Sequence, residues 1–189
     1  MTETQAGPAQ AVLVTPSLDL RAAFEDMAED YRAAGEGPVD NLFSMLSHDF
    51  AAYVERLERE GYIRDNRGAR VPATTYWLYQ PAEDALIGTS RLRHELTPGL
   101  THEGGHIGYS IRPSARRQGY GTRILELTLD KAREHGIFEV LITCDTDNAG
   151  SARIIEKNGG VFENEVLSER TGKPVSRYWI TLDQPGGMA

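Results

Sequence analysis

The stretch from residue 106 to residue 135 constrains the fold of this chain more than any other part of its sequence. It opens with His-Ile-Gly-Tyr-Ser-Ile, whose residue types are typical of a β-strand, and Pro113 closes this strand. A basic turn at Arg116–Gln118 follows, and Gly119 and Gly121 then begin a run with the apolar spacing of an amphipathic helix. The chain must therefore pass from a strand through a tight turn into a long helix.

Hydrophobic periodicity predicts the remaining elements. Helices are expected over residues 17–31, about 41–59, 121–135 and 151–158, and strands over 11–14, 74–80, 85–92, 106–111, 140–143, 161–167 and 177–182. Residues 64–72 are expected to form a charged loop. This order predicts one α/β domain with a mixed sheet over residues 11–183, between flexible ends at 1–10 and 184–189.

Composition excludes several classes of protein. The 28 acidic side chains outnumber the 20 basic ones, and a net charge of −8 argues against nucleic-acid binding, which needs a basic face. A single cysteine, Cys144, excludes an internal disulfide and an all-cysteine metal site. No apolar run approaches the roughly 20 residues of a membrane helix, and the N-terminus lacks the features of a secretory signal. We therefore expect a cytoplasmic protein with no membrane partner.

The turn before the long helix has the chemistry of an anion site. Glycines let the backbone approach a ligand closely. The first amides of a helix have no partner inside it, and the helix dipole favours an anion there. Arg116 and Arg117 add positive charge, so the sequence predicts a diphosphate site. The alternative is a glycine-rich helix start without a ligand, since the turn matches neither common phosphate-loop fingerprint.

Three stretches of the sequence resemble the GNAT acetyltransferase superfamily. They are GGHIGYSIRPS at Gly104–Ser114, LITCDTDNAGSARIIEKNGG at Leu141–Gly160 and RYWI at Arg177–Ile180. The resemblance covers about residues 76–182 and is closest to a bacterial branch that carries these motifs. It implies a GNAT-like, mostly antiparallel sheet flanked by helices. It also implies acetyl-CoA as the acetyl donor and, as acceptor, an amine of a small molecule, an amino acid or a peptide.

The resemblance further implies which residues bind acetyl-CoA. The strand edge at Tyr109–Ile111 would pair with the pantetheine amides. The turn amides from Arg117 to Thr122 would hold the pyrophosphate, in agreement with the electrostatics of the turn. Asn148 matches a cofactor-contacting asparagine of the family, and Ser151 lies just beyond it. The implied cofactor-binding residues are Tyr109, Ser110, Ile111, Arg116, Arg117, Gln118, Gly119, Tyr120, Gly121, Thr122, Asn148 and Ser151.

Acetyl transfer to an amine needs a base. An alkylammonium group, with a pKa of roughly 10, has no lone pair, so a proton must leave before the nitrogen attacks. His106 is the first candidate, because imidazole titrates near roughly 6.5, and Glu103 is the second. The alternative for His106 is a hydrogen-bonded strand residue without a catalytic role.

The departing CoA thiolate needs a hydrogen-bond or proton donor that the usual position does not supply. Family members often carry a proton-donating tyrosine seven residues after the asparagine, and this position is Ile155 here. Tyr178, Tyr109 and Cys144 are candidate substitutes. Each is also typical of a residue that packs within a strand.

A competing motif is present at residues 102–106, where His-Glu-Gly-Gly-His matches the H-E-x-x-H pattern of zinc hydrolases. That chemistry needs both histidines on one helix face. The two glycines disfavour a helix, each by about 1 kcal/mol relative to alanine, and a strand follows. We therefore expect no metal site, and zinc hydrolysis is a remote alternative.

The isoleucine at position 155 also leaves open a non-catalytic acyl-CoA-binding or regulatory domain. For an enzyme, we expect the acceptor in a cleft between the N-terminal helices, the loop of residues 95–105 and the final hairpin. Exposed strand edges and the aromatic pair Tyr178-Trp179 are compatible with a homodimer.

Overall fold

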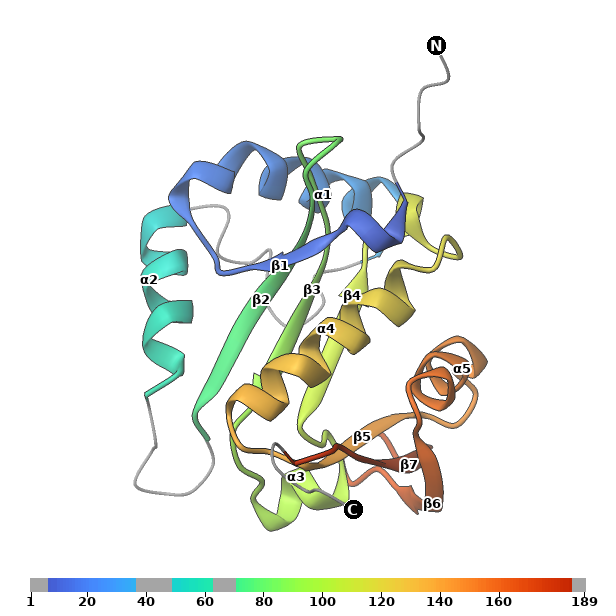
Figure 1. The fold of residues 1–189 in the computed structure, drawn as a ribbon. Coiled ribbons are helices and arrows are strands. Elements are labelled where there is room, and N and C mark those ends of the chain that lie inside the picture. The colour runs from blue at the N-terminus through green and yellow to red at the C-terminus, as the bar shows by residue number, and fades with distance from the viewer. Residues whose placement is uncertain (1–6, 37–48, 63–70, 185–189) are drawn as a thin grey trace.

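A computed structural model describes residues 7–36, 49–62 and 71–184 (Figure 1). The strands are β1 (Val12–Val14), β2 (Ala73–Gln80), β3 (Ala85–Arg93), β4 (Ile107–Ile111), β5 (Glu139–Asp145), β6 (Val161–Leu167) and β7 (Pro174–Thr181). The α-helices are α1 (Arg21–Ala33), α2 (Phe50–Glu60), α3 (Pro98–His102), α4 (Tyr120–Glu134) and α5 (Ala149–Lys157). Short 3₁₀ helices are η1 (Pro8–Gln10), η2 (Leu18–Leu20) and η4 (Pro113–Ala115). No helix in these described ranges is long and apolar enough to cross a membrane.

Two antiparallel sheets form the centre of the molecule. The first has the strand order β1-β2-β3-β4, and the second has the order β5-β7-β6. The sheets meet where the amide of His106 donates to the carbonyl of Leu141 at 2.7 Å and the amide of Leu141 donates to His106 Nδ1 at 2.9 Å. Beyond this junction β4 and β5 diverge, as Figure 1 shows. This junction thus joins two sheets that separate toward α4.

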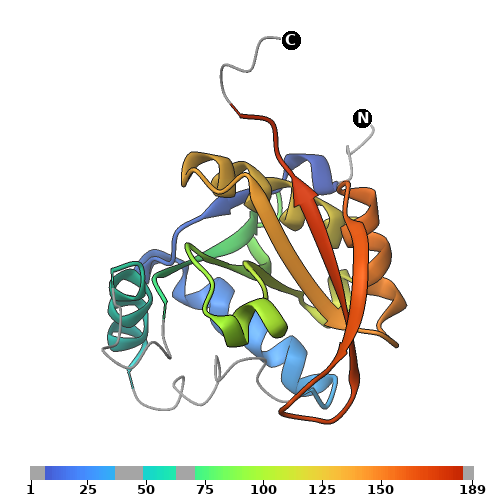
Figure 2. The same ribbon diagram turned by 90° about the horizontal axis from the view of Figure 1, so that it is seen from below.

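Helices cover both faces of the first sheet. α1 and α2 pack on one face, where Phe24, Tyr53 and Trp77 form an aromatic core. α4 crosses the opposite face, and α5 lies beside α4 (Figures 1 and 2). Leu125 of α4 and Ile142 of β5 belong to the core on this side. The apolar stripe of α4 is therefore buried against both sheets. This packing holds the N-terminus of the helix in place beside the end of β4.

The predicted α/β architecture, with antiparallel strands flanked by helices, is confirmed. In the structure, the one sheet that the sequence predicted is divided into two, with the break between β4 and β5. α2 is the described part of the second predicted helix, and Asp49 caps it by accepting hydrogen bonds from the amides of Ala51 and Ala52 at 3.0 and 3.2 Å. Residues 41–48 of that prediction and residues 64–70 of the predicted loop lie outside the described residues.

Two local expectations differ from the structure. Residues 98–102 were expected within a loop but form α3, because Pro98 suits the first turn of a helix and Thr97 Oγ1 accepts a bond from the Leu100 amide at 3.2 Å. β7 begins at Pro174 rather than Arg177. A proline is compatible with the first residue of a strand, where no ladder bond from its nitrogen is needed.

The described part of the N-terminal segment lies against the domain. The carbonyl of Gly7 accepts a hydrogen bond from Gln80 Nε2 at 3.0 Å, and Pro8 lies next to Gly119. This segment therefore borders the turn before α4. The flexible ends and the single domain over residues 11–183 stay predictions.

Gly105 permits the junction between the two sheets, because its φ is +59° and a Cβ here would lie 2.4 Å from the Leu141 carbonyl oxygen. Gly105→Ala should combine backbone strain with overlap, and we predict a loss of about 2 kcal/mol or more in the free energy of unfolding, measured with urea. Gly108→Ala is the control, since its Cβ would meet nothing within 4 Å. Equal stability of the two variants would contradict this role of Gly105.

Candidate functional site

A cavity of about 870 Å³ lies between the end of β4, the turn before α4, and α5. Its wall contains Tyr109, Ser110, Ile111, Arg116, Arg117, Gly119, Gly121, Thr122, Asn148, Gly150, Ser151, Arg153, Ile154 and Lys157. Of the predicted cofactor-binding residues, Gln118 and Tyr120 are not on this wall. Gln118 Nε2 donates to the carbonyl of Ser114 at 2.9 Å, and the hydroxyl of Tyr120 accepts from Gln80 Nε2 at 3.3 Å. The other predicted residues come together from three separate parts of the sequence.

The turn before α4 brings backbone amides without a partner inside the helix to the cavity wall. Arg117 and Gly119 are left-handed, with φ of 62° and 93°, and left-handed residues in a turn bring neighbouring amides to one side. The amide of Arg123 donates to the carbonyl of Gly119 at 3.2 Å, so the amides of residues 119–122 precede the internal bonds of α4. The dipole of this 15-residue helix adds partial positive charge. These features suit a bound anion.

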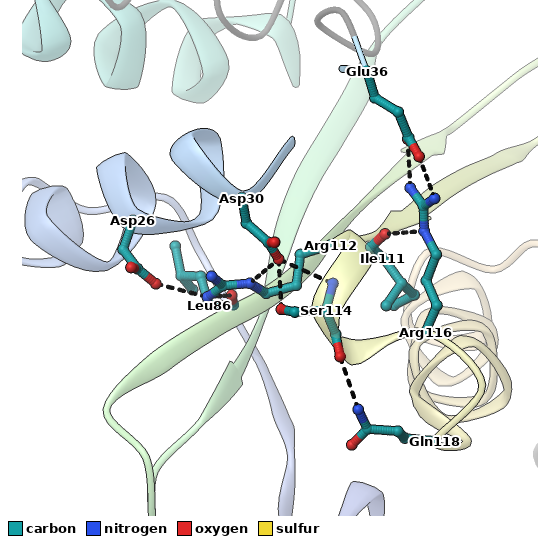
Figure 3. Close-up of polar contacts among 9 residues, drawn as sticks. All are labelled: Asp26, Asp30, Glu36, Leu86, Ile111, Arg112, Ser114, Arg116 and Gln118. Carbon is teal, nitrogen blue, oxygen red and sulfur yellow. Dashed lines mark hydrogen bonds and ion pairs between the residues drawn. The ribbon is translucent and has the colours of Figure 1, made fainter. Parts of the chain in front are cut away.

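Ion pairs from α1 hold the segment that leads into this turn (Figure 3). Arg112 Nη1 lies 2.7 Å from Asp26 Oδ2, and Arg112 Nε lies 2.8 Å from Asp30 Oδ2. Asp30 Oδ2 also accepts bonds from the amide and hydroxyl of Ser114, at 3.1 and 2.5 Å. Burial acts to raise the pKa of Asp30, but the bonds from Arg112 and Ser114 outweigh it and lower that pKa. The carboxylate therefore stays charged and fixes η4 to α1.

Arg116 lies on the cavity wall, but its guanidinium is already engaged. Its Nη1 and Nη2 atoms donate to the two carboxylate oxygens of Glu36 at 2.5 and 2.6 Å, and its Nε donates to the carbonyl of Ile111 at 3.0 Å (Figure 3). The hydrogen bonds from Arg116 lower the pKa of Glu36. In this structure Arg116 therefore positions the turn, and the phosphate contact that the sequence suggested stays a prediction.

Three other cations lie on the cavity wall, namely Arg117, Arg153 and Lys157. Within the described part of the chain none of them forms an ion pair, and the wall contains no acidic residue. α5 places Gly150, Arg153, Ile154 and Lys157 on one face, at the helical spacing i, i+3, i+4 and i+7. Sequence reasoning missed these four residues, although their spacing could have indicated a shared face. The cavity is therefore positively charged.

Gly121 and Asn148 have structural roles at this site. A Cβ at Gly121 would lie 2.5 Å from Ile154 Cδ1, so this glycine leaves room for the end of the Ile154 side chain between α4 and α5. Asn148 caps α5, since its Oδ1 accepts a bond from the amide of Ser151 at 3.0 Å. Both residues shape the cavity through the position of α5.

His106 lies at the sheet junction and is 9% exposed. Its Nδ1 accepts the bond from Leu141, so the neutral ring carries its proton on Nε2 and has no free lone pair. Burial, together with the charge of Arg93, lowers its pKa to about 4. A base needs a free lone pair at the substrate. This arrangement favours the hydrogen-bonded strand residue over the predicted base.

Glu103 and Tyr178, the other two catalytic candidates, also lie away from the cavity wall. Glu103 follows α3, and its Oε1 lies 3.5 Å from Arg170 Nη2. Tyr178 is a buried residue of β7, in edge contact with Phe162 at a ring-centroid distance of 5.6 Å, and burial raises its pKa. The structure therefore gathers ten of the twelve predicted cofactor residues on the cavity wall, but none of the three predicted catalytic residues.

The two histidines of the H-E-x-x-H stretch lie on different elements. His102 ends α3, with its Nε2 2.9 Å from the carbonyl oxygen of Leu167, whereas His106 precedes β4. Glu103 between them is extended, with φ −144° and ψ 131°. This stretch lacks the single helix that a zinc hydrolase needs. Among the residues that the structure describes, no group of three or more potential ligating side chains could hold a metal ion.

Known proteins share this architecture. A family model described as an acetyltransferase (GNAT) domain matches residues 18–161 of the chain. No curated protein sequence matches this chain. Among solved structures, RimL, a ribosomal L7/L12 alpha-N-protein acetyltransferase in complex with coenzyme A, is similar with a TM-score of 0.64 and 17% identity. The match covers 92% of this chain and 95% of that chain.

Two further structures show the same fold. A ribosomal-protein-S5-alanine acetyltransferase from Vibrio fischeri has a TM-score of 0.66 and 14% identity, over 92% of this chain and 94% of that one. The microcin C7 self-immunity acetyltransferase MccE, in complex with acetyl-CoA and AMP, has a TM-score of 0.64 and 13% identity, over 95% and 98%. At these low sequence identities, the similarity shows that the proteins share a fold.

Burial of His106 predicts a loss of stability in acid. In the unfolded chain an imidazole binds a proton near pH 6.5, whereas folded His106 does so only near its pKa of about 4. This group should therefore lower the free energy of unfolding by about 3 kcal/mol as the pH falls from about 6.5 to about 4. His106→Asn keeps an acceptor for the Leu141 amide without titrating, so urea unfolding across this range should show a shallower slope. An unchanged slope would contradict the assignment.

Proposed function

The chain belongs to the GNAT acetyltransferase family, and on this basis we propose that it is an acetyl-CoA-dependent N-acetyltransferase acting on an amine of a small molecule or a peptide. The observation that carries the proposal is the cavity wall, which combines the amides at the start of α4 with three cations. Among the residues that the structure describes, these cations form no ion pair and no acidic side chain lies on the wall. Such a wall suits the diphosphate of CoA, because it is an anion that needs both hydrogen-bond donors and positive charge.

The size of the cavity supports a large donor. Its volume of about 870 Å³ lies in the upper part of the range of about 300–1,000 Å³ for small-molecule pockets. Arg117 lies beside the amides of residues 119–122, and Arg153 and Lys157 approach from α5. RimL and MccE have a similar fold and contain CoA and acetyl-CoA in their structures, which supports the same donor here. Acetyl-CoA would supply the activated acetyl group as a thioester.

The free edge of β4 offers a place for the pantetheine arm. On one side β4 pairs with β3, with Tyr109 opposite Ser90. On the other side β5 leaves β4 after the junction between His106 and Leu141. The backbone around Tyr109 is therefore open along that edge, while the carbonyl of Ile111 already accepts from Arg116 Nε. An extended chain that carries amides can add to the edge at Tyr109 like a further strand.

Glu103 is the better base in this proposal, because His106 has no free lone pair. The side chain of Glu103 is 22% exposed, and its described ion pair with Arg170 spans 3.5 Å, which leaves lone pairs for a proton. The neighbouring Gly104 donates its amide to Thr143 Oγ1 at 3.0 Å, so this segment lies beside β5. A carboxylate here would accept the proton of the amine directly or through water.

The acceptor would enter between α1 and α2, residues 95–105 and the hairpin of β6 and β7. RimL and the Vibrio fischeri enzyme are described as ribosomal-protein acetyltransferases, which makes a peptide amine one class to test. The edge strand β6 exposes Val161, Phe162 and Leu167 at 69%, 52% and 65%. Apolar side chains along an open edge support a homodimer as part of the proposal.

A non-catalytic acyl-CoA-binding domain is the second candidate. Ile155 is fully buried at the position where related enzymes often carry a tyrosine, so α5 supplies no hydroxyl there. A domain of this kind would bind acetyl-CoA without releasing the thiol.

Calorimetric titration with acetyl-CoA tests the donor site. The double variant Arg153→Ala/Lys157→Ala should bind at least about tenfold more weakly, because hydrogen bonds to charged groups contribute about 1.5–3 kcal/mol each. Arg133→Ala is the control, since Arg133 pairs with Asp130 on α4 and is not on the cavity wall. An unchanged dissociation constant in the double variant would contradict the proposed site.

Release of the CoA thiol separates the enzyme from the binding domain. The wild-type protein should release thiol from acetyl-CoA in the presence of some members of a panel of polyamines, amino acids and peptides. Binding of acetyl-CoA without release across the panel would favour the non-catalytic domain.

A further inference from the structure

Gly108 leaves an open position on the face of the first sheet that carries α1 and α2. Its neighbours in β4, Ile107 and Tyr109, pack into the core on the α4 side, so position 108 points to the opposite face. Gly108 is exposed, and a Cβ built on it would meet nothing within 4 Å. A strand position with no side chain and no neighbour lets a second molecule approach the backbone closely.

This open position is continuous with the proposed donor site. Ser110, the next residue of β4 on the same face, lines the cavity. The turn before α4 follows β4, so a donor held by this turn would extend along β4 from the end of the strand toward its start. The open edge of β4 ends at the junction of His106 with β5. The acyl end of the donor would therefore lie near Gly108.

A guanidinium group lies beside the same position. Arg91 of β3 stands opposite Gly108 in the register of the two strands, and directly opposed residues of an antiparallel pair are about 5 Å apart. The Arg91 side chain lies on the α2 side of the sheet, because it forms an ion pair with Glu60 of α2. Glu60 also pairs with Arg56 at 3.2 Å. Two guanidinium groups thus share one carboxylate, which leaves this cluster with an excess of positive charge.

Arg91 retains hydrogen-bond donors for a ligand. Its side chain is 34% exposed, whereas that of Glu60 is 14% exposed. Within the described part of the chain, only its Nη1 atom has a partner, the carboxylate of Glu60, although a guanidinium carries five N–H donors. The ion pair with Glu60 holds the side chain in place, so less rotamer freedom is lost when a ligand binds. A carboxylate matches the remaining donors in charge and geometry.

We propose that the acceptor is a small amine that carries a carboxylate, such as a free amino acid, with its carboxylate at Arg91 and its amine over Gly108. This inference rests on the proposed function and names the substrate class of that site. In the transfer the amine nitrogen bonds to the acetyl carbon, the carbon–sulfur bond breaks with its electron pair on the CoA sulfur, and the proton of the amine passes to the base. A polyamine, which carries only positive charge, would be repelled by the two guanidinium groups.

Thiol release with matched acceptors tests this substrate class. The acceptors are the common L-amino acids, their carboxamides, which keep the shape without the charge, and spermidine. For the best amino acid we expect kcat/KM to be at least about tenfold higher than for its carboxamide. Ionisation of the amine acts against this result, because a neighbouring carboxylate stabilises the ammonium form of the amino acid. A preference for the amino acid therefore reports recognition of the carboxylate.

Variants of Arg91 separate recognition from a structural role. Arg91→Gln should lower kcat/KM for the best amino acid at least about tenfold and leave the value for its carboxamide within about twofold, because only the charged contact is lost. Arg91→Lys keeps the charge and should recover part of the loss. The control is Arg59→Gln, since Arg59 pairs with Glu55 on the exposed surface of α2. In all three variants the dissociation constant of acetyl-CoA should stay within about twofold.

A second variant fills the open position. Gly108→Val should fold, because valine suits a strand and a Cβ here meets no neighbour. Its side chain would occupy the space of the acceptor, so KM for the amino acid should rise about tenfold or more. An unchanged KM would contradict an acceptor over Gly108.

The outcomes distinguish this inference from the proposed function. Equal kcat/KM for amino acids and carboxamides, or a preference for spermidine, would overturn the substrate class and leave the proposed function intact. An equal loss toward both acceptors in Arg91→Gln would overturn the role of Arg91. Acetyl-CoA that binds but releases no thiol with any acceptor would overturn the proposed enzyme and this inference with it. Thermal unfolding confirms that each variant is folded before its activity is measured.

Discussion

The pair of hydrogen bonds between His106 and Leu141 is the contact on which the rest of the structure depends. It joins the two sheets, and β4 and β5 separate beyond it. Gly105 makes the approach possible, because a side chain there would overlap the carbonyl of Leu141. The open edge of β4 and the cavity between β4 and α5 both follow from this divergence. His106 therefore serves the site through the backbone geometry that it stabilises.

A second constraint acts on the turn before α4. α1 lies on the opposite face of the first sheet, yet its Asp30 binds Arg112 and Ser114, and Glu36 just after it binds Arg116 (Figure 3). These contacts use the side chains around the turn and leave its backbone amides for a ligand. The cations that remain available, such as Arg117, belong to the turn itself or to α5. The site is thus divided between groups that hold the turn and groups that face the cavity.

Local signals made the fold and the cavity predictable from the sequence. The proline, the glycines and the helical periodicity of residues 106–135 lie close together, so the strand, the turn and the helix could all be assigned. The partners of the arginines could not be predicted, because Glu36 lies 80 residues from Arg116 and Asp30 lies 82 residues from Arg112. The same holds for His106, whose bond with Leu141 spans 35 residues and favours a structural role over the role of base that its residue type suggested.

The central claim is that the amides at the start of α4 bind the diphosphate of acetyl-CoA. A crystal structure of the protein with acetyl-CoA tests it most directly. The account predicts diphosphate oxygens at about 3 Å from the amides of residues 119–122, with pantetheine along the edge of β4. A diphosphate bound elsewhere, with the turn contacting only solvent, would contradict it.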